Sequence, residues 1–320
     1  MYKIGIIDTM KDKGIELLKS YKGFDCELVT DLSRENLLLK LPEFDGITLR
    51  RGKIDREILN KCDKLKVIAR HGVGYDSVDT VSLKEKGITL LVAHNSTSTS
   101  PAEHIMFMIM NIYKGVSMFD SMVRNGDFVK AIHLNIEQNF ELFDKTVLIA
   151  GFGRIGKKLI KKCLGFDMKV IVFDPYVDDK VIVSFGGKKV SNLEDALKVA
   201  DILSLSLPLN SETKNFITLR EMKLMKKSSV IINAARGGVV NEVDLNNALN
   251  NNIIAFAGID VFEKEPPELT NPLLTNKKVV LSPHAATFTK EGLESMAVET
   301  AQNIIDFFEN KIESTKIVKL

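Results

Sequence analysis

The sequence lacks tryptophan altogether and has only three cysteines among its 320 residues. Cys26, Cys62 and Cys163 lie far apart, are odd in number, and form neither a C-x-x-C pair nor a cluster with histidine. This pattern argues against a disulfide framework and a zinc site, so we predict that the protein binds no metal. Because thiols stay reduced in the cytoplasm, the pattern also favours a cytoplasmic protein.

An excess of one charge and long apolar runs are also missing. The chain has 44 Lys and Arg against 42 Asp and Glu, which gives no reason to expect nucleic acid or an anionic membrane as a partner. No apolar stretch reaches the roughly 20 residues that span a bilayer, and the run near Met1 is too short for a signal peptide. The length of 320 residues suggests two domains.

The sequence does contain a regular alternation of β-rich runs and amphipathic segments, which predicts an α/β fold with parallel sheets covered by helices on both faces. A long apolar helix over 99–120 interrupts the alternation, with Ser100 as its predicted N-cap and Glu103 closing a capping box. The segment 292–311 has helical spacing and is expected to pack back on the first domain. The predicted strands are 2–8, 24–30, 44–50, 65–72, 88–93, 145–150, 168–174, 201–208, 228–235, 253–262 and 277–283.

A glycine-rich loop follows the strand 145–150. Gly151, Gly153 and Gly156 fit the pattern G-x-G-x-x-G, an amphipathic helix follows them, and the next strand ends in Asp174. In this setting the glycines allow a tight turn, a close approach of the backbone to a pyrophosphate, and close helix packing. The helix N-terminus adds amide donors for the phosphates. A carboxylate at Asp174 would bind the ribose and repel a 2′-phosphate, so the predicted cofactor is NAD.

Three polar residues stand at or just beyond the ends of later strands: Arg236 in "NAARGGVV", Glu265 in "DVFEKEP" and His284 in "SPHAAT". Ligands of open α/β sheets bind beyond the carboxyl ends of strands. Arginine binds a carboxylate, histidine moves a proton, and glutamate favours the protonated histidine. Taken singly, each residue could instead have a plain structural role, as a surface ion pair, a solvated loop residue or a hydrogen-bonded turn residue.

With these motifs the sequence resembles the D-isomer-specific 2-hydroxyacid dehydrogenases, a family that includes D-3-phosphoglycerate dehydrogenases, hydroxypyruvate/glyoxylate reductases and D-lactate dehydrogenases. The resemblance implies reversible hydride transfer between NAD(H) and a small 2-oxo or 2-hydroxy acid, with the 3-phosphoglycerate or hydroxypyruvate/glyoxylate class favoured. It rests on "RHGVGYDSVD" (70–79), "TSPAEH" (99–104), "GFGRIGKKL" (151–159) with Asp174, "SLPLNSET" (206–213), "NAARGGVV" (233–240), "DVFEKEP" (260–266) and "SPHAAT" (282–287).

The resemblance also implies an architecture of two Rossmann-like or flavodoxin-like domains with the active site in the interdomain cleft. The flavodoxin-like substrate domain would be 1–98 plus 288–320, and the NAD-binding Rossmann domain would be 99–287. The apolar segment 101–112 would lie in a homodimer interface of the cofactor domain. Because the chain ends at Leu320, we expect no additional regulatory domain of the kind that some phosphoglycerate dehydrogenases carry.

Motif by motif, the resemblance assigns roles to individual residues. Arg236, Glu265 and His284 would be the catalytic residues, and Asp260 would contact the nicotinamide amide. The predicted cofactor-binding residues are Gly151, Gly153, Arg154, Ile155, Gly156, Asp174, Pro208, Thr213, Ala234 and Asp260. The predicted substrate residues are Arg50, His71, Gly72, Val73 and Gly74. We predict structural roles for the remaining histidines, His94, His104 and His133.

One departure from the family pattern concerns the substrate. The family often has Arg-Ser where this chain has Arg50-Arg51, and adjacent strand residues point to opposite faces, so only one arginine is expected to reach the cleft. Together with Lys53 and Arg70 it would favour a substrate with a second anion, such as 3-phosphohydroxypyruvate. Solvated loop cations are an equally good interpretation.

Three rival functions are weighed against this one. Formate dehydrogenases of the superfamily carry Gln in place of Glu265, which disfavours that reaction. An NAD-sensing corepressor of the same fold could keep the same motifs and act as a binding protein. A plain α/β binding protein without a nucleotide would leave the glycine loop unexplained.

Overall fold

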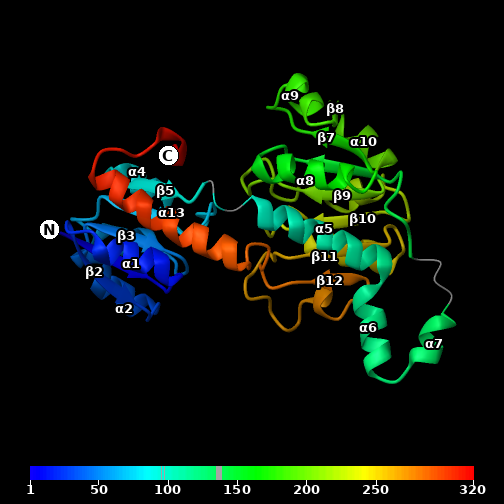
Figure 1. Ribbon diagram of the computed structural model, residues 1–320, viewed down its shortest axis with the longest axis horizontal. Coiled ribbons are helices and arrows are strands. Elements are labelled where there is room, and N and C mark those ends of the chain that lie inside the picture. The colour runs from blue at the N-terminus through cyan, green and yellow to red at the C-terminus, as the bar shows by residue number, and fades with distance from the viewer. Residues whose placement is uncertain (95, 97, 135–138) are drawn as a thin grey trace. The chain divides into compact units, whose positions relative to one another are not determined.

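The computed structural model describes residues 1–94, 96, 98–134 and 139–320 (Figure 1). The chain divides into two compact units, Met1–Thr97 with Phe288–Leu320 (unit 1) and Ser98–Thr287 (unit 2). Each unit contains one sheet in which every pair of neighbouring strands is parallel. The α/β fold with parallel sheets is therefore confirmed.

Unit 1 has a five-stranded sheet in the order β2-β1-β3-β4-β5. One face is covered by the first helix α1 and the C-terminal helix α13, which approach so closely that a Cβ on Gly14 would lie 2.5 Å from the backbone oxygen of Ala297. Leucine and isoleucine side chains of α2, α3 and α4 cover the other face. The elements of unit 1 are β1 Tyr2–Ile7, α1 Asp12–Ser20, β2 Phe24–Val29, α2 Arg34–Lys40, η1 Leu41–Glu43, β3 Gly46–Leu49, α3 Arg56–Asn60, β4 Val67–Arg70, α4 Thr80–Lys86, β5 Thr89–Val92, α13 Lys290–Phe308 and η3 Ser314–Lys316.

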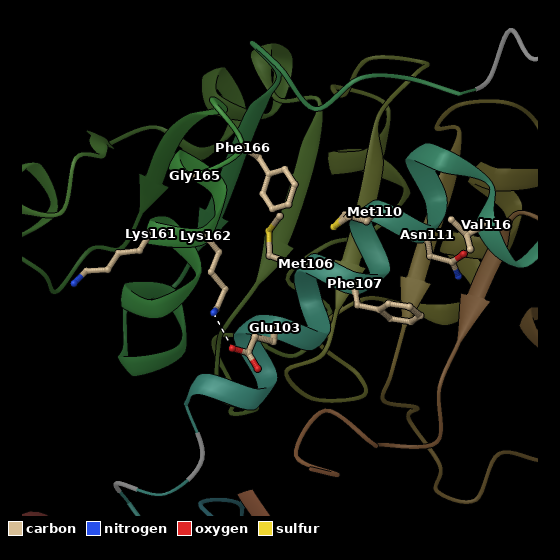
Figure 2. A pocket seen from close by; sticks show the side chains of 10 residues that line it. All are labelled: Glu103, Met106, Phe107, Met110, Asn111, Val116, Lys161, Lys162, Gly165 and Phe166. Atoms are coloured by element: carbon tan, nitrogen blue, oxygen red, sulfur yellow. Dashed lines mark hydrogen bonds and ion pairs between the residues drawn. The ribbon is translucent and has the colours of Figure 1, made fainter. Parts of the chain in front are cut away.

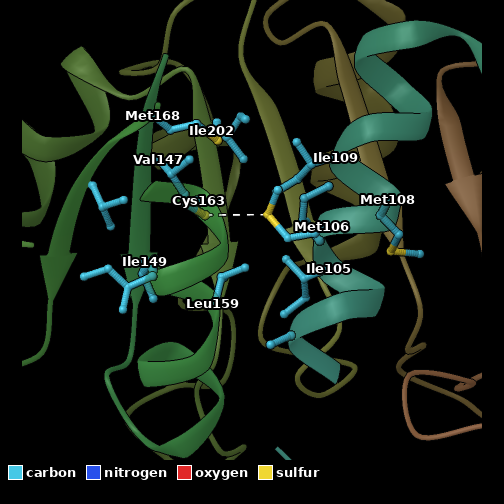
Figure 3. Packing of buried hydrophobic residues seen from close by; sticks show 14 of the residues in the cluster. Ile105, Met106, Met108, Ile109, Val147, Ile149, Leu159, Cys163, Met168 and Ile202 are labelled. Atoms are coloured by element: carbon cyan, nitrogen blue, oxygen red, sulfur yellow. Dashed lines mark hydrogen bonds between the residues drawn. The ribbon is translucent and has the colours of Figure 1, made fainter. Parts of the chain in front are cut away.

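Unit 2 has a seven-stranded sheet in the order β12-β11-β10-β9-β6-β7-β8. On one face α5 packs against α8, and the Sγ of Cys163 lies 3.7 Å from the Sδ of Met106 (Figure 3). On the other face lie α10, α11 and α12. The elements of unit 2 are α5 Thr99–Lys114, α6 Val116–Arg124, α7 Phe128–Ile132, β6 Thr146–Ala150, α8 Arg154–Leu164, β7 Lys169–Phe173, α9 Asp179–Ser184, β8 Lys188–Val190, α10 Leu193–Val199, β9 Ile202–Leu205, α11 Leu219–Met222, β10 Val230–Asn233, α12 Glu242–Asn250, β11 Phe256–Ile259, η2 Pro272–Leu274 and β12 Val279–Leu281.

Each of the eleven predicted strands is present, in every case shorter than its apolar run. One strand was missed, β8 at the edge of the unit 2 sheet, which spans Lys188–Val190. Its lysines hide it from a search for apolar runs, and charged residues of this kind are common on edge strands because they discourage pairing with other chains. The helices in the described part of the chain include none long and apolar enough to cross a membrane.

The helix predicted over 99–120 is two helices. Gly115 adopts a left-handed conformation (φ 62°) that ends α5, and α6 begins at the next residue. The predicted capping box is also wrong, because the helix starts at Thr99 without a side-chain cap. The Ser100 hydroxyl donates to the carbonyl oxygen of Ala286 at 2.7 Å, and Glu103 pairs with Lys162. Longer-range partners have thus taken the two side chains that the capping pattern assigned to the helix end.

Candidate active site

The sheet order of unit 2 brings the three predicted catalytic residues to one edge. The strands β10, β11 and β12 are neighbours, and Arg236, Glu265 and His284 follow their carboxyl ends. Because parallel strands end at the same edge of a sheet, the loops that carry these residues meet there. The tertiary fold therefore assembles residues that are far apart in the sequence, since α12, β11, η2 and β12 lie between Arg236 and His284.

His284 and Glu265 form a direct pair. The Nδ1 atom of His284 lies 2.8 Å from Oε2 of Glu265, and both side chains remain partly exposed. This hydrogen bond raises the pKa of His284 above its ordinary value, against the lowering effects of burial and of the Arg236 charge. Burial alone would raise the pKa of Glu265, but the bond from His284 brings it below its ordinary value. The pair therefore favours a protonated histidine beside an ionised glutamate.

Arg236 is held in place by the end of β10. Its Nη1 donates to the carbonyl oxygen of Ala235 at 2.6 Å, and the side-chain amide of Asn233 donates to the carbonyl of Arg236 at 2.9 Å. The next residue must be glycine, because a Cβ on Gly237 would lie 1.8 Å from the backbone oxygen of Phe262. Since the positive charge of Arg236 lowers the pKa of His284, the two side chains are electrostatic neighbours.

Asn233 supports the turn that carries Arg236 and was not singled out from the sequence. It is the last residue of β10 and is buried, and its Oδ1 accepts the backbone N–H of Ala235 at 3.1 Å. With both ends of its amide bonded to the 235–236 backbone, it fixes the turn that presents Arg236. A buried asparagine at the end of an apolar strand was the available signal, because buried polar side chains are kept for the hydrogen bonds they make.

The glycine loop has the geometry that a dinucleotide requires. Gly151 has φ 95°, and a Cβ there would lie 2.5 Å from the oxygen of Ser206. A Cβ on Gly156 would lie 2.6 Å from the oxygen of Gly151. Gly153, by contrast, faces open space, with no atom within 4 Å of an added Cβ. Two glycines thus close the turn on itself while the middle one leaves the helix N-terminus accessible, which fits a bound pyrophosphate.

Asp174 sits where β7 ends and contacts the same loop. Its Oδ2 accepts the backbone N–H of Phe152 at 2.7 Å, and its Oδ1 accepts those of Tyr176 and Val177 at 2.9 and 3.1 Å. The carboxylate therefore joins the end of β7 to the glycine loop. This role inside the protein is additional to the predicted contact with a ribose.

The other predicted cofactor residues surround the same edge of the sheet. Arg154 and Ile155 open α8, and Ala234 follows β10. The hydroxyl of Thr213 lies 2.6 Å from the carbonyl oxygen of Pro208, which makes the loop after β9 compact. Asp260 differs from its neighbours, because its side chain is fully buried and accepts bonds from the 282–286 loop. Its predicted contact with a nicotinamide amide stays a prediction.

The predicted substrate residues lie in unit 1, beyond the ends of β3 and β4, which are adjacent in that sheet. The loop after β4 contains Gly72 with φ 125°, a conformation that favours glycine. His71 is buried in this loop, and burial together with the nearby Arg50 lowers the pKa of its imidazole to about 4. His71 is therefore neutral at physiological pH. Val73 and Gly74 complete the loop and are half-buried.

The basic cluster of unit 1 is largely engaged within the protein. Arg51 makes two bonds to the buried Asp8, at 2.6 and 3.3 Å, and these outweigh burial to lower the pKa of Asp8. Arg70 donates to the carbonyl oxygens of Leu49, Arg50 and Gly74. Arg50 donates to the carbonyl of Thr9 at 3.1 Å and lies 4.0 Å from Asp8. Asp8 was not anticipated, and an acid at the end of an apolar strand was its signal.

Comparison with known proteins identifies the family. The model of the D-isomer specific 2-hydroxyacid dehydrogenase NAD binding domain matches residues 106–286, which include the glycine loop, Arg236, Glu265 and His284. The chain belongs to the D-isomer-specific 2-hydroxyacid dehydrogenase family. The resemblance stated from the motifs is confirmed, and the chain carries the NAD-binding domain of this family.

Two curated proteins and one solved structure are examples of what the chain is similar to. The chain is 34% identical over 305 residues to a D-3-phosphoglycerate dehydrogenase of Methanocaldococcus jannaschii, covering 95% of this chain but only 57% of that protein. It is 34% identical over 328 residues to a glyoxylate reductase of Thermococcus litoralis, covering 99% of this chain and 97% of that protein. An acyclic imino acid reductase, solved in complex with NADPH and D-Arg, has a TM-score of 0.88 and 26% identity, covering 99% of this chain and 100% of that one.

Proposed function

We propose that the protein is an NAD-dependent D-2-hydroxyacid dehydrogenase that transfers a hydride between NAD(H) and a small 2-oxo or 2-hydroxy acid. The observation that carries the proposal is the 2.8 Å pair of His284 and Glu265 beside the charge of Arg236, at the same sheet edge as the glycine loop. A carboxylate binder, a proton donor and a dinucleotide loop are together what this reaction needs.

Each residue of the proposed site has a separate part in the reaction. When bound, NADH supplies the hydride. Arg236 binds the substrate carboxylate and polarises the neighbouring carbonyl. His284 gives its proton to the carbonyl oxygen as the C=O π bond becomes a C–H and an O–H bond, and in the oxidation direction it takes that proton back. Glu265 stabilises the imidazolium and, by holding Nδ1, directs Nε2 at the substrate. From unit 1, Arg50 and the loop 71–74 are proposed to bind the substrate carboxylate.

NAD is the preferred cofactor in this proposal, rather than NADP. The support is Asp174, whose carboxylate stands where β7 ends and would repel a 2′-phosphate. Gly151, Gly153 and Gly156 with the first residues of α8 would hold the pyrophosphate. An imino acid reductase of similar structure was solved with NADPH, so both nucleotides belong in the test.

For the substrate we propose the glyoxylate/hydroxypyruvate class ahead of 3-phosphohydroxypyruvate. The basic cluster had suggested a second substrate anion, but Arg51 is bonded to Asp8 and Arg70 to three backbone carbonyls. Arg50 differs from both, because its one side-chain hydrogen bond among the described residues goes to the Thr9 carbonyl and Asp8 lies 4.0 Å away. One such cation suits a single carboxylate better than a carboxylate and a phosphate.

A homodimer is part of the proposal, formed through α5, α6 and α7. An open groove of about 550 Å³ lies along α5 and α8, and Figure 2 shows Met106, Met110 and Phe166 pointing toward one another in it. No residue of α6 or α7 is buried among the described ones. An apolar surface of this extent marks an interaction site, and we propose a second copy of the chain as its partner. Its exposed apolar residues are Phe107, Met110, Val116, Met118, Val123, Phe128, Val129 and Ile132.

Light scattering across a range of concentrations tests the dimer. We expect twice the monomer mass for the wild type and a shift to monomer for Phe107→Glu. Leu39→Glu is the control, because Leu39 is as exposed but lies on α2 of unit 1. A wild-type monomer at all concentrations would contradict the dimer.

We also propose a cytoplasmic location, supported by the buried, unbridged thiols of Cys62 and Cys163.

The decisive test of function is the loss of NADH absorbance with a panel of acids: glyoxylate, hydroxypyruvate, 3-phosphohydroxypyruvate, pyruvate and branched 2-oxo acids, each repeated with NADPH. We expect turnover with NADH and a preference for an unphosphorylated small acid. A phosphorylated winner would overturn the substrate assignment but not the class. Tight NADH binding without turnover on any acid would overturn the enzyme and support the corepressor alternative.

A further inference from the structure

The carboxylate of Asp260 is enclosed by four polar groups. Its side chain is fully buried, its Oδ1 accepts from the Ser282 hydroxyl at 2.5 Å and from the Ala285 N–H at 2.8 Å, and its Oδ2 accepts from the Ala286 N–H at 3.1 Å. The fourth group is His104 on α5, whose Nε2 lies 3.4 Å from Oδ1. A buried charge is tolerated only when such partners surround it.

The direction of the hydrogen bonds follows from the number of protons. The Ser282 hydroxyl has one proton, and the 2.5 Å separation assigns it to Asp260. The oxygen of Ser282 must therefore accept at its 2.9 Å contact with His104 Nε2. His104 accordingly carries a proton on Nε2, in either its neutral or its charged form. His104 is therefore the first donor in a series of hydrogen bonds that runs from α5 through Ser282 to Asp260.

Asp260, at the end of this series of hydrogen bonds, also binds the loop that contains His284. The backbone N–H of His284 donates to the backbone oxygen of Asp260 at 2.7 Å. His284 itself has φ 53°, a left-handed conformation that is costly for a non-glycine residue and persists only when its surroundings enforce it. At the far end of the loop, the Ser100 hydroxyl donates to the carbonyl of Ala286. The first turns of α5 thus hold both ends of the 282–286 loop, through Ser100 and through His104.

We propose that His104 is a positioning residue for His284, acting through Ser282 and Asp260 to hold the left-handed loop in the geometry that proton transfer needs. The proposal rests on the dehydrogenase function proposed above and goes beyond the structural role predicted for His104. Helix α5 in this view has a function besides packing on α8. A shift of about 1 Å at a proton donor can lower turnover roughly a hundredfold, so loss of a hydrogen bond that holds His284 in place should be visible in kcat.

Two substitutions separate hydrogen bonding from packing. His104→Leu keeps a side chain of similar size but cannot donate to Ser282, whereas the amide of His104→Gln reaches nearly the same point as Nε2 and donates. We expect kcat for the preferred 2-oxo acid to fall about tenfold or more in the Leu variant, with KM and the NADH dissociation constant changed by less than about threefold. The Gln variant should recover most of the lost kcat. Glu103→Gln is the control, because Glu103 is next to His104 on α5 and the substitution removes only its surface ion pair with Lys162 of α8. This variant should behave as the wild type.

Ser282→Ala tests the connection itself. If His104 acts through Ser282, the double variant His104→Leu/Ser282→Ala should be no slower than the slower single variant, because both remove one chain of bonds. Multiplying effects would overturn the proposal, and so would a His104→Leu variant with wild-type kcat or a Gln variant no better than Leu. A crystal structure of His104→Leu gives a readout that needs no turnover: His284 should leave φ 53°, and an unchanged loop would overturn the proposal.

Failure of the dehydrogenase function would look different from failure of this proposal. A wild type inactive on the whole panel removes the function, and with it the proton transfer that His104 would serve. An active wild type with unaltered His104→Leu kinetics removes the positioning role alone.

Discussion

Asp174 accepts the backbone N–H of Phe152 at 2.7 Å, so the residue predicted to select the cofactor also holds the glycine loop against the end of β7. The two roles can be separated. Asp174→Asn removes the negative charge but keeps an oxygen that can accept from Phe152, whereas Asp174→Ala removes both. We expect the preference for NADH over NADPH to fall about tenfold or more in both variants, since a charge-assisted hydrogen bond is worth roughly 1.5–3 kcal/mol.

Nucleotide titrations followed by fluorescence would check the binding, and thermal unfolding would check the loop. Only Asp174→Ala should lose several degrees in Tm. An unchanged ratio of NADH to NADPH affinity in both variants would exclude Asp174 from the ribose site.

We expect substitution by alanine to affect NADH binding at Gly153 and stability at Gly237. An added Cβ at Gly153 meets no atom within 4 Å, so Gly153→Ala should fold normally and weaken NADH binding about tenfold or more by occupying the path of the pyrophosphate. An added Cβ at Gly237 would lie 1.8 Å from the oxygen of Phe262, so Gly237→Ala should lower Tm and displace Arg236. Tm and NADH affinity measured on both variants decide the matter. Unaltered NADH affinity in Gly153→Ala would count against the nucleotide site.

Arg236→Ala should damage turnover far more than cofactor binding. Removing a cation that acts on the reacting carbonyl typically lowers kcat about 10²–10³-fold, while the NADH dissociation constant should stay within about threefold. Arg236→Lys should be intermediate at best, because a point charge cannot replace the two-pronged bond to a carboxylate. Steady-state kinetics and direct NADH titration give the two numbers. Equal losses in both, or no loss in either, would contradict the assignment.

The pH dependence of reduction should depend on Glu265. The pKa of His284 is raised by its bond to Glu265, so the protonated form that reduction needs persists to higher pH than in a free histidine, and the rate falls only as pH rises through that raised pKa. In Glu265→Gln the charge of the partner is lost, and burial and Arg236 then lower the pKa. The descending limb of kcat/KM for reduction should move to lower pH.

The profile of Glu268→Gln provides the control for that shift, because this exposed carboxylate pairs only with Lys264 in the same loop, among the partners the structure describes. A limb that stays in place in Glu265→Gln would show that another group controls the reaction.

We expect the folded protein to lose stability in mild acid because of the buried His71. Its folded pKa of about 4 lies below the ordinary histidine pKa of about 6.5, so between these values the unfolded chain binds more protons than the folded one. Stability contributed by neutral His71 is present above pH 6.5 and is lost as the pH falls toward 4, by on the order of 3 kcal/mol. Urea unfolding at pH 7 and pH 4.5 should show a smaller loss for His71→Gln than for the wild type. His133→Gln, at an exposed position, should lose as much as the wild type.

Most of the fold could be predicted because its signals are local. Apolar runs marked every strand except the lysine-rich β8, and the glycine loop was visible in a few adjacent residues with the strand and helix around it. The uses of Ser100 and Glu103 could not be predicted, because each depends on a partner far away in the sequence, Ala286 or Lys162. The break at Gly115 had a local signal, a glycine in the left-handed conformation that ends helices, and was overlooked within the long apolar run. Capping patterns describe isolated helix ends, and tertiary hydrogen bonds override them.

The candidate site shows the same division. Arg236, Glu265 and His284 were found because each follows an apolar strand, and strand ends are where α/β sheets bind ligands. Asn233 and Asp8 were missed because each bonds to other protein groups, and the sequence does not show which groups those are. The contacts on which the proposal for His104 rests were hidden for the same reason. The engagement of Arg51 was missed for the same reason, because its bond to Asp8 joins two residues that follow different strands, β3 and β1.

The helix α13 determines the order in which the protein can fold during synthesis. Unit 2 is one continuous stretch, Ser98–Thr287, whereas unit 1 needs Phe288–Leu320 to cover the face of its sheet that contains Ile4, Ile6, Val67 and Ala69. Until α13 leaves the ribosome, that apolar face has no cover other than α1. We therefore expect the second-made unit to fold first, and the N-terminal strands to wait as a nascent chain in need of chaperone protection.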